Sequence, residues 1–299
     1  MSEVFVGVDS GGSKTLAVVV DAAGNELSRK SGAGANYAVS GLDWVVHTIT
    51  SVVSEALSLA GVTDKPKAAW LGVAGTDRPE DYDALYPALS SVADKIKITN
   101  DGDLGLCALR DNVGIAVIAG TGAIAVGVDV NGKRDRTGGW GHIIGDEGSG
   151  YDIGRRGLQA AVRMADGRGV NTSLLDKILH KWSLHDPSEI IPKVYHNHDK
   201  ALVASVAEIV FEAAAEGDQV SKQIIVDSIH EIALLALPLA RRLEFPDGVV
   251  PLALCGGLLV GNTSFREGVL DILSQHCNLG QVEVVQEPAL AAARAARNI

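Results

Sequence analysis

Two distant segments of the chain share one pattern, in which an apolar strand, a glycine-rich turn and a second apolar strand follow one another. The first segment reads VGVDSGGSKTLAVVVDAAG and the second reads IAVIAGTGAIAVGVDVNG. Each return strand ends in a further turn, as expected for a hairpin. We therefore expect strands at Val4–Asp9, Thr15–Asp21, Gly114–Ala119 and Ala123–Val130.

Helices and strands alternate after each hairpin. After the first, we expect a helix at Leu42–Ala60, a strand at Ala68–Val73, a helix near Asp81–Ala93 and a strand at Ile96–Thr99. After the second, we expect a helical block at Tyr151–Glu244, a strand at Val250–Leu254, a helix at Ser264–Ser274, a strand at Val282–Val285 and a closing helix. This order predicts mixed sheets covered by helices on both faces.

The sequence thus predicts an α/β protein of two similar domains with a central cleft. Its 299 residues are enough for two domains with a core each. We place the first domain at residues 1–112, completed by a C-terminal helix at 287–299. The second domain covers residues 113–286, with 151–244 as a helical insertion.

Charge and cysteine content narrow the class of protein. A formal net charge of −11 argues against a nucleic-acid binder, which would show a basic face. Cys107, Cys255 and Cys277 lie far apart and form no CxxC pair, so neither a disulfide framework nor a zinc knuckle is expected. The N-terminus lacks a signal-peptide pattern, and the apolar segment Ile232–Ala240 is too short to span a bilayer. We expect a cytoplasmic protein without nucleic-acid or membrane partners.

The two glycine turns are candidate phosphate sites, because their backbone N–H groups are not covered by side chains. Each turn alone could be an ordinary hairpin tip. Neither is a Rossmann fingerprint or a P-loop, since a strand pattern rather than a helix follows each turn. The residues expected at the phosphates are Gly11, Gly12, Ser13, Lys14, Thr15, Gly120, Thr121 and Gly122.

Two carboxylates follow predicted strands. Asp9 ends the first strand beside the first turn, where it could hold the water shell of Mg²⁺ on a nucleotide or simply cap the turn. Asp101 follows the strand Ile96–Thr99, where it could accept a proton from a substrate hydroxyl. Spacing alone does not choose between Asp101 and Asp103.

Two further glycine-containing segments indicate ligand contacts. The stretch GGWGHIIGDEGSGYDIG, residues 138–154, combines glycines with an aromatic residue and several carboxylates, which would suit a sugar. Within it we expect His142 to be structural and Ser149 to begin the next helix. Gly256 and Gly257 close a short apolar strand, where they would suit the adenosine half of ATP or could form an ordinary strand-to-helix turn.

Together these motifs resemble the BadF/BadG-type ATPases, and within them the N-acetylglucosamine kinases of the sugar kinase–hsp70–actin superfamily, over nearly the whole chain. VGVDSGGSKT and IAGTGAIAVG are similar to the two phosphate motifs, ALCGGLL to the adenosine motif, and the stretch at 138–154 to the group's signature. The resemblance implies ribonuclease H-like (actin-like) domains, a homodimer, and transfer of the γ-phosphoryl group of MgATP to the 6-hydroxyl of N-acetylglucosamine.

The resemblance also implies roles for single residues. Asp101 would be the general base, and Asn36 would contact the hexosamine. Gly256 and Gly257 would flank the adenosine. Other positions that match the sugar pocket are Thr121, Gly139, Trp140, Asp146 and Gly150. Glucosamine and N-acetylmuramic acid stay open as acceptors, and a nucleotide-driven activator of a dehydratase stays open as a different class of function.

Overall fold

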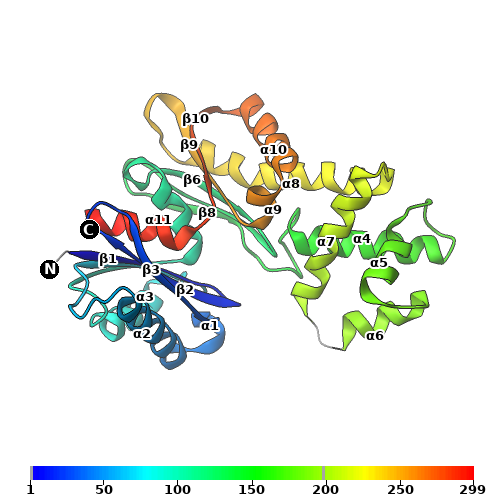
Figure 1. Ribbon diagram of the computed structural model, residues 1–299. Helices are drawn as coiled ribbons and strands as arrows, with labels where there is room; N and C mark the ends of the chain where they lie inside the picture. The colour runs from blue at the N-terminus through cyan, green and yellow to red at the C-terminus, as the bar shows by residue number, and fades with distance from the viewer. Residues whose placement is uncertain (1–2, 197–198) are drawn as a thin grey trace. The chain divides into compact units, whose positions relative to one another are not determined.

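The computed structural model describes residues 3–196 and 199–299, and the chain divides into two compact units. Unit 1 is Met1–Ala116 with Val285–Ile299, and unit 2 is Val117–Val284. Each unit contains a five-stranded sheet covered by helices, so the expected α/β class with mixed sheets is confirmed (Figure 1). The roles of the units as a sugar-binding and a nucleotide-binding domain stay predictions.

The sheet of unit 1 has the order β3-β2-β1-β4-β5. β1 pairs with β2 antiparallel and with β4 parallel, and β4 pairs with β5 parallel. The unbroken apolar runs of β1 and β4 are explained by their central position, where both faces of the sheet are covered. The strands are β1 (Val4–Ser10), β2 (Lys14–Asp21), β3 (Glu26–Ala33), β4 (Ala68–Val73) and β5 (Lys95–Thr99).

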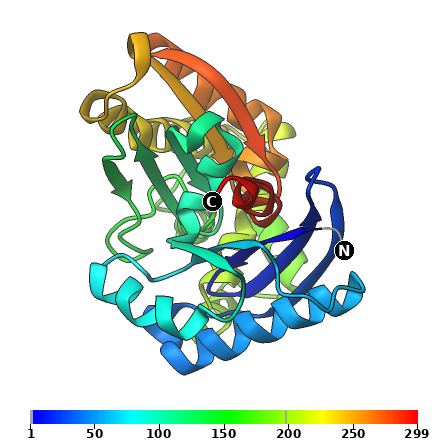
Figure 2. The same ribbon diagram turned by 90° about the vertical axis from the view of Figure 1, so that its left-hand side faces the viewer.

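Helices cover the two faces of this sheet differently. α1 (Tyr37–Ser40), α2 (Leu42–Leu59) and α3 (Pro79–Leu89) lie on one face, where α2 packs its buried valine, isoleucine and alanine side chains into the core (Figure 2). The last helix, α11 (Pro288–Ala295), and the 3-10 helix η1 (Asp101–Ala108) pack on the other face. α11 presents small alanine side chains and approaches so closely that a Cβ at Gly7 would lie 2.0 Å from the Ala289 oxygen.

The sheet of unit 2 has the order β10-β9-β6-β7-β8, and β7 and β8 form an antiparallel hairpin. Helices α4 to α7 gather in one group beside the sheet, and the long helix α8 leads from them back to β7 and β8 (Figure 1). The strands are β6 (Gly114–Ala119), β7 (Ala123–Val128), β8 (Arg134–Gly138), β9 (Val249–Cys255) and β10 (Asn278–Val285). The helices are α4 (Gly150–Ala165), α5 (Leu174–Trp182), α6 (Ile190–Tyr195), α7 (Lys200–Ala215), α8 (Gln219–Arg242), α9 (Gly257–Gly261) and α10 (Thr263–His276).

The structure corrects several expected boundaries. β3 and β8 were not expected, because both are polar strands at a sheet edge with no apolar run. β10 begins at Asn278 rather than Val282 for the same reason, since its first residues are mostly exposed. α3 begins at Pro79 and ends at Leu89, and β7 ends at Val128. The block between β8 and β9 is helical, as expected.

Within the described ranges, α8 is long and apolar enough to cross a membrane, judged by length and composition alone. This is weak evidence, because core helices of globular proteins pass the same test. Ile232, Ala233 and Leu239 of α8 are fully buried in the protein. We therefore describe α8 as a core helix of unit 2.

Candidate active site

The carboxyl ends of β1, β4 and β5 lie at one edge of the sheet of unit 1, because these strands are parallel neighbours. The register places Asp9 beside Gly72, and Gly72 beside Thr99. Asp101 follows Thr99 by two residues and so reaches the same edge. Ligands of open α/β sheets bind outside the carboxyl ends of strands. This edge therefore carries both Asp9, expected at the Mg²⁺ ion, and Asp101, expected to accept a proton.

The surroundings of Asp9 and Asp101 favour the protonated carboxyl group. Burial raises the pKa of Asp9 to about 6, although the positive charge of Lys14 opposes the rise. Burial raises the pKa of Asp101 to about 7, and the negative charge of Asp9 adds to this effect. The backbone N–H of Gly102 donates to Oδ1 of Asp101 at 3.0 Å. A carboxylate whose pKa lies near neutrality suits proton transfer at cellular pH.

Asp103 lies in different surroundings. It is 6% exposed within η1, and its charge acts on Lys97, whose ammonium group lies 3.7 Å from the centre of the Trp70 ring. That Asp101 rather than Asp103 accepts the proton stays a prediction.

The first glycine turn exposes its backbone. It is closed by the Gly11 N–H, which donates to the Lys14 oxygen at 3.0 Å, and a Cβ at Gly12 would meet nothing within 4 Å. Gly12, Ser13 and Lys14 are exposed, as a phosphate site requires. Thr15 differs, because its hydroxyl is buried and lies 3.1 Å from that of Ser10. Thr15 thus holds the turn, and its contact with phosphate stays a prediction.

The second glycine turn is held by backbone groups at the start of α4. The N–H of Gly150 donates to the Gly120 oxygen at 2.8 Å, and that of Tyr151 donates to the Thr121 oxygen at 3.1 Å. Oδ1 of Asp146 accepts from the N–H of Ala123 at 3.2 Å. A Cβ at Gly122 would lie 2.8 Å from Asp146 Oδ2, so a larger residue there would displace the Asp146 carboxylate. Asp146 and Gly150, expected at the sugar, also fix this turn.

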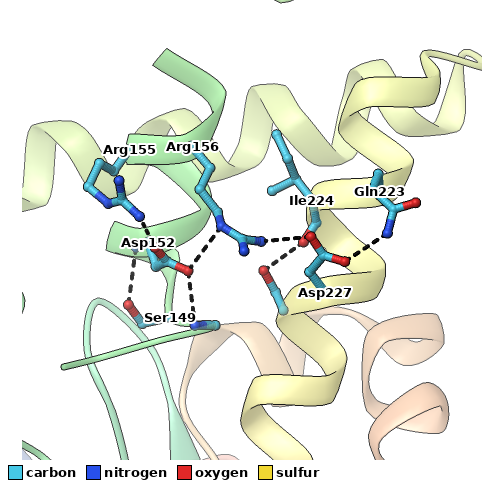
Figure 3. A network of polar contacts seen from close by, with 9 residues as sticks. Ser149, Asp152, Arg155, Arg156, Gln223, Ile224 and Asp227 are labelled. Atoms are coloured by element: carbon cyan, nitrogen blue, oxygen red, sulfur yellow. Dashed lines mark hydrogen bonds and ion pairs between the residues drawn. The ribbon is translucent and has the colours of Figure 1, made fainter. Parts of the chain in front are cut away.

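A polar network holds the start of α4 to α8 (Figure 3). Ser149 caps α4 by accepting from the N–H of Asp152, as expected for the first residue of a helix. Asp152 forms ion pairs with Arg155 at 2.7 Å and Arg156 at 3.6 Å. Arg156 also donates to Asp227 of α8 at 3.3 Å. The network fixes the helix that supports the second turn.

A groove of about 630 Å³ lies in unit 2 beside the second turn. Gly120 and Thr121 line it together with Gly257 and the exposed face of α7. Residues of α7 were not expected there, although their spacing of three and four places them on one face of the helix. They are Ala201, Ala204, Ser205, Ala207, Glu208 and Phe211. The groove connects the second glycine turn with Gly257, one of the two glycines expected at the adenosine.

Gly256 and Gly257, the two glycines expected at the adenosine, have different surroundings. Gly256 has φ +87°, and a Cβ there would lie 2.4 Å from the Ala119 oxygen. A Cβ at Gly257 would meet nothing within 4 Å, because this residue faces the groove. Gly256 is therefore required by the fold, and Gly257 leaves room for a ligand.

Substitutions should distinguish the role of Gly256 in the fold from the role of Gly257 in ligand binding. We expect Gly257→Val to raise the KM for ATP by about 10-fold or more with little change in Tm, because the valine fills the groove. We expect Gly256→Ala to destabilise the protein by about 1–3 kcal/mol or more, since alanine is strained at this φ. Steady-state kinetics and thermal unfolding of both variants measure the two effects. Equal losses of stability in the two variants would contradict the assignment.

The residues expected at the sugar belong to both units. Asn36 is in unit 1, whereas Thr121, Gly139, Trp140, Asp146 and Gly150 are in unit 2. Trp140 is 64% exposed, and its ring lies 4.8 Å from the Arg136 guanidinium. The His142 ring packs edge-on against Tyr151, and its expected structural role stays a prediction. The sugar contacts themselves stay predictions.

Among residues 3–196 and 199–299, no group of three or more His, Cys, Asp or Glu side chains could hold a metal ion. A metal bound wholly by protein side chains is not indicated by this part of the chain. Mg²⁺ does not need such a cage, because it keeps waters and binds substrate phosphates beside one or two carboxylates. Asp9, next to an exposed phosphate turn, fits that pattern.

Comparisons with known proteins identify a family and several relatives. The model of the BadF/BadG/BcrA/BcrD ATPase family matches residues 6–296. The N-acetylmuramic acid/N-acetylglucosamine kinase of Clostridium acetobutylicum is 33% identical over 259 residues, 85% of this chain and 85% of that protein. The N-acetyl-D-glucosamine kinase of Dictyostelium discoideum is 30% identical over 318 residues, 99% of this chain and 98% of that protein.

A solved structure shows the same fold. It is a Chromobacterium violaceum protein provisionally named an N-acetylglucosamine kinase, with a TM-score of 0.78 and 23% identity over 98% of this chain and 99% of that one. This likeness agrees with the expected α/β fold of two domains. By its sequence and its fold, the chain belongs to the BadF/BadG/BcrA/BcrD ATPase family.

Proposed function

We propose that this protein is an ATP-dependent kinase that transfers the γ-phosphoryl group to the 6-hydroxyl of an amino sugar, with N-acetylglucosamine as the main acceptor. The names of both relatives support this substrate class. The structural observation that carries the proposal is Asp101, a partly buried carboxyl group with a pKa of about 7 at the carboxyl edge of parallel strands. N-acetylmuramic acid is a second candidate acceptor, favoured by the relative that is named for both sugars.

In the proposed reaction, the oxygen of the sugar 6-hydroxyl attacks the γ-phosphorus and ADP leaves. Asp101 accepts the proton that the hydroxyl loses. The backbone N–H groups of Gly11, Gly12 and Gly120 bind phosphate oxygens. Asp9 would hold Mg²⁺, and the ion, when bound, would neutralise charge on the phosphates. The groove in unit 2 takes ATP, with its adenosine against Gly257.

A substrate panel tests this function. Release of ADP is measured in a coupled assay with MgATP and N-acetylglucosamine, N-acetylmuramic acid, glucosamine or glucose. We expect the highest kcat/KM with N-acetylglucosamine, and loss of turnover when EDTA removes the metal. ATP hydrolysis that is indifferent to all four sugars, or an iron–sulfur chromophore in the purified protein, would indicate the activator class instead. A homodimer and a cytoplasmic location stay predictions.

A further inference from the structure

The loop Ala74–Asp77 follows β4, the strand that lies between those carrying Asp9 and leading to Asp101. Its backbone is firmly held. The Ala74 oxygen accepts from the N–H of Tyr37 at 2.8 Å, and the Thr76 oxygen accepts from the hydroxyl of Tyr82 at 2.9 Å. Gly75 within this loop has φ +78°. The loop is therefore a fixed part of the edge where the acceptor sugar is expected.

The carboxamide of Asn36 lies directly over Gly75. A Cβ at Gly75 would come within 2.4 Å of Asn36 Oδ1 and within 2.8 Å of the Ala38 nitrogen. No side chain larger than hydrogen fits between them without displacing Asn36. The position of this carboxamide thus depends on a glycine far away in the sequence.

Oδ1 of Asn36 is buried and accepts no hydrogen bond from the described residues. Asn36 occupies the N-cap position of α1, but its side chain does not cap the helix. A buried acceptor without a donor destabilises a protein, so such an atom calls for an explanation beyond folding. A ligand hydroxyl or N–H group would supply the missing donor.

The same loop is linked to the general base. Nδ2 of Asn100 donates to the Thr76 oxygen at 3.3 Å, while Oδ1 of Asn100 accepts from the N–H of Gly102 at 3.0 Å. The Gly102 N–H is also the group that donates to Asp101. Asn36 and Asp101 are therefore both positioned by contacts with one loop.

We propose that Gly75 is a positioning residue of the acceptor site. Because Gly75 has no side chain, the Asn36 carboxamide can occupy the position in which it accepts a hydrogen bond from a hydroxyl or N–H group of the sugar. The proposal rests on the function proposed above. A substitution at Gly75 should therefore change the affinity for the sugar and leave the affinity for ATP unchanged. It also predicts that Gly75 acts through Asn36, so that its effect disappears when the carboxamide is removed.

The test compares Gly75→Ala with a matched control. We expect Gly75→Ala to raise the KM for N-acetylglucosamine by about 10-fold or more, the range for loss of one hydrogen bond, with the KM for ATP unchanged. Gly41→Ala is the control, because Gly41 has φ +76° and a Cβ there would meet nothing within 4 Å. It also places alanine at a positive φ but without the clash, so its sugar KM should stay near the wild-type value. Equal effects of the two substitutions would overturn the proposal.

A double-mutant cycle tests whether Gly75 acts through Asn36. In an Asn36→Ala background, Gly75→Ala should change the sugar KM little further, whereas fully additive effects would refute the coupling. If Gly75→Ala is too unstable to assay, its Tm is compared with that of the double variant. A higher Tm in the double variant supports the contact, and an unchanged Tm overturns it.

Calorimetry of the wild type separates failure of the inference from failure of the proposed function. If the wild-type protein binds none of the amino sugars, the proposed function has failed. The Tm comparison still decides whether Gly75 positions Asn36.

Discussion

Replacement of Asp101 by asparagine is expected to lower kcat by about 10²–10⁴-fold, the usual contribution of a general base. Asparagine has nearly the same shape and keeps an acceptor for the Gly102 N–H, but it takes up no proton. The KM for the sugar and the Tm at acidic pH should therefore change little. Coupled kinetics with N-acetylglucosamine and MgATP, together with calorimetry of sugar binding, measure these quantities.

Asp103→Asn is the matched comparison. It removes one negative charge two residues away, from a carboxylate whose charge acts on both Lys97 and Asp101. We expect it to reduce stability more than kcat. If Asp103→Asn lost as much kcat as Asp101→Asn, or if Asp101→Asn kept near-normal turnover with intact sugar binding, Asp101 would not be the base.

The second large effect expected is a fall in kcat/KM for the sugar of about 10-fold per pH unit below pH 7. The base must be ionised to accept a proton, and burial raises the pKa of Asp101 to about 7. Asp9, with a pKa of about 6, steepens the decline at lower pH. The measurement is kcat/KM between pH 5 and 9 at fixed MgATP. A profile that stays flat down to pH 5 would contradict a buried carboxylate base.

Stability should change with pH in the opposite direction. Between its unfolded value of 3.8 and about 7, Asp101 binds more proton in the folded state, so the free energy of unfolding falls as pH rises. Asp101→Asn removes this cost and should be more stable than the wild type at pH 8, by on the order of 2 kcal/mol. Chemical denaturation at pH 5 and pH 8 measures the difference. Equal pH dependence in the two proteins would show that another group is responsible.

Periodicity and turn residues were enough to predict most of the fold. The strands β1, β2, β6 and β7 are apolar runs, and the glycine turns mark where they reverse. β3 and β8 were not predicted because an edge strand is partly exposed to solvent and can consist of polar residues. Pairing with a neighbour, rather than composition, makes these two segments strands.

The candidate site was predictable only in part. Asp9 and Asp101 follow from the rule that ligands lie at carboxyl ends of strands. The choice between Asp101 and Asp103 depends on which charges lie near each carboxylate, and spacing contains no such information. The contact between Gly75 and Asn36 joins two loops, and neither has a sequence pattern that would indicate it.

The packing of α11 against β1 has a consequence for synthesis on the ribosome. Most of unit 1 precedes unit 2 in the chain, yet the helix that covers one face of its sheet follows unit 2. Until α11 has been synthesised, Phe5, Trp70 and Leu104 lack the alanine-rich surface that buries them. The first unit therefore keeps an open apolar face while unit 2 is translated. A stop codon between unit 2 and α11 would leave the sheet of unit 1 without this cover.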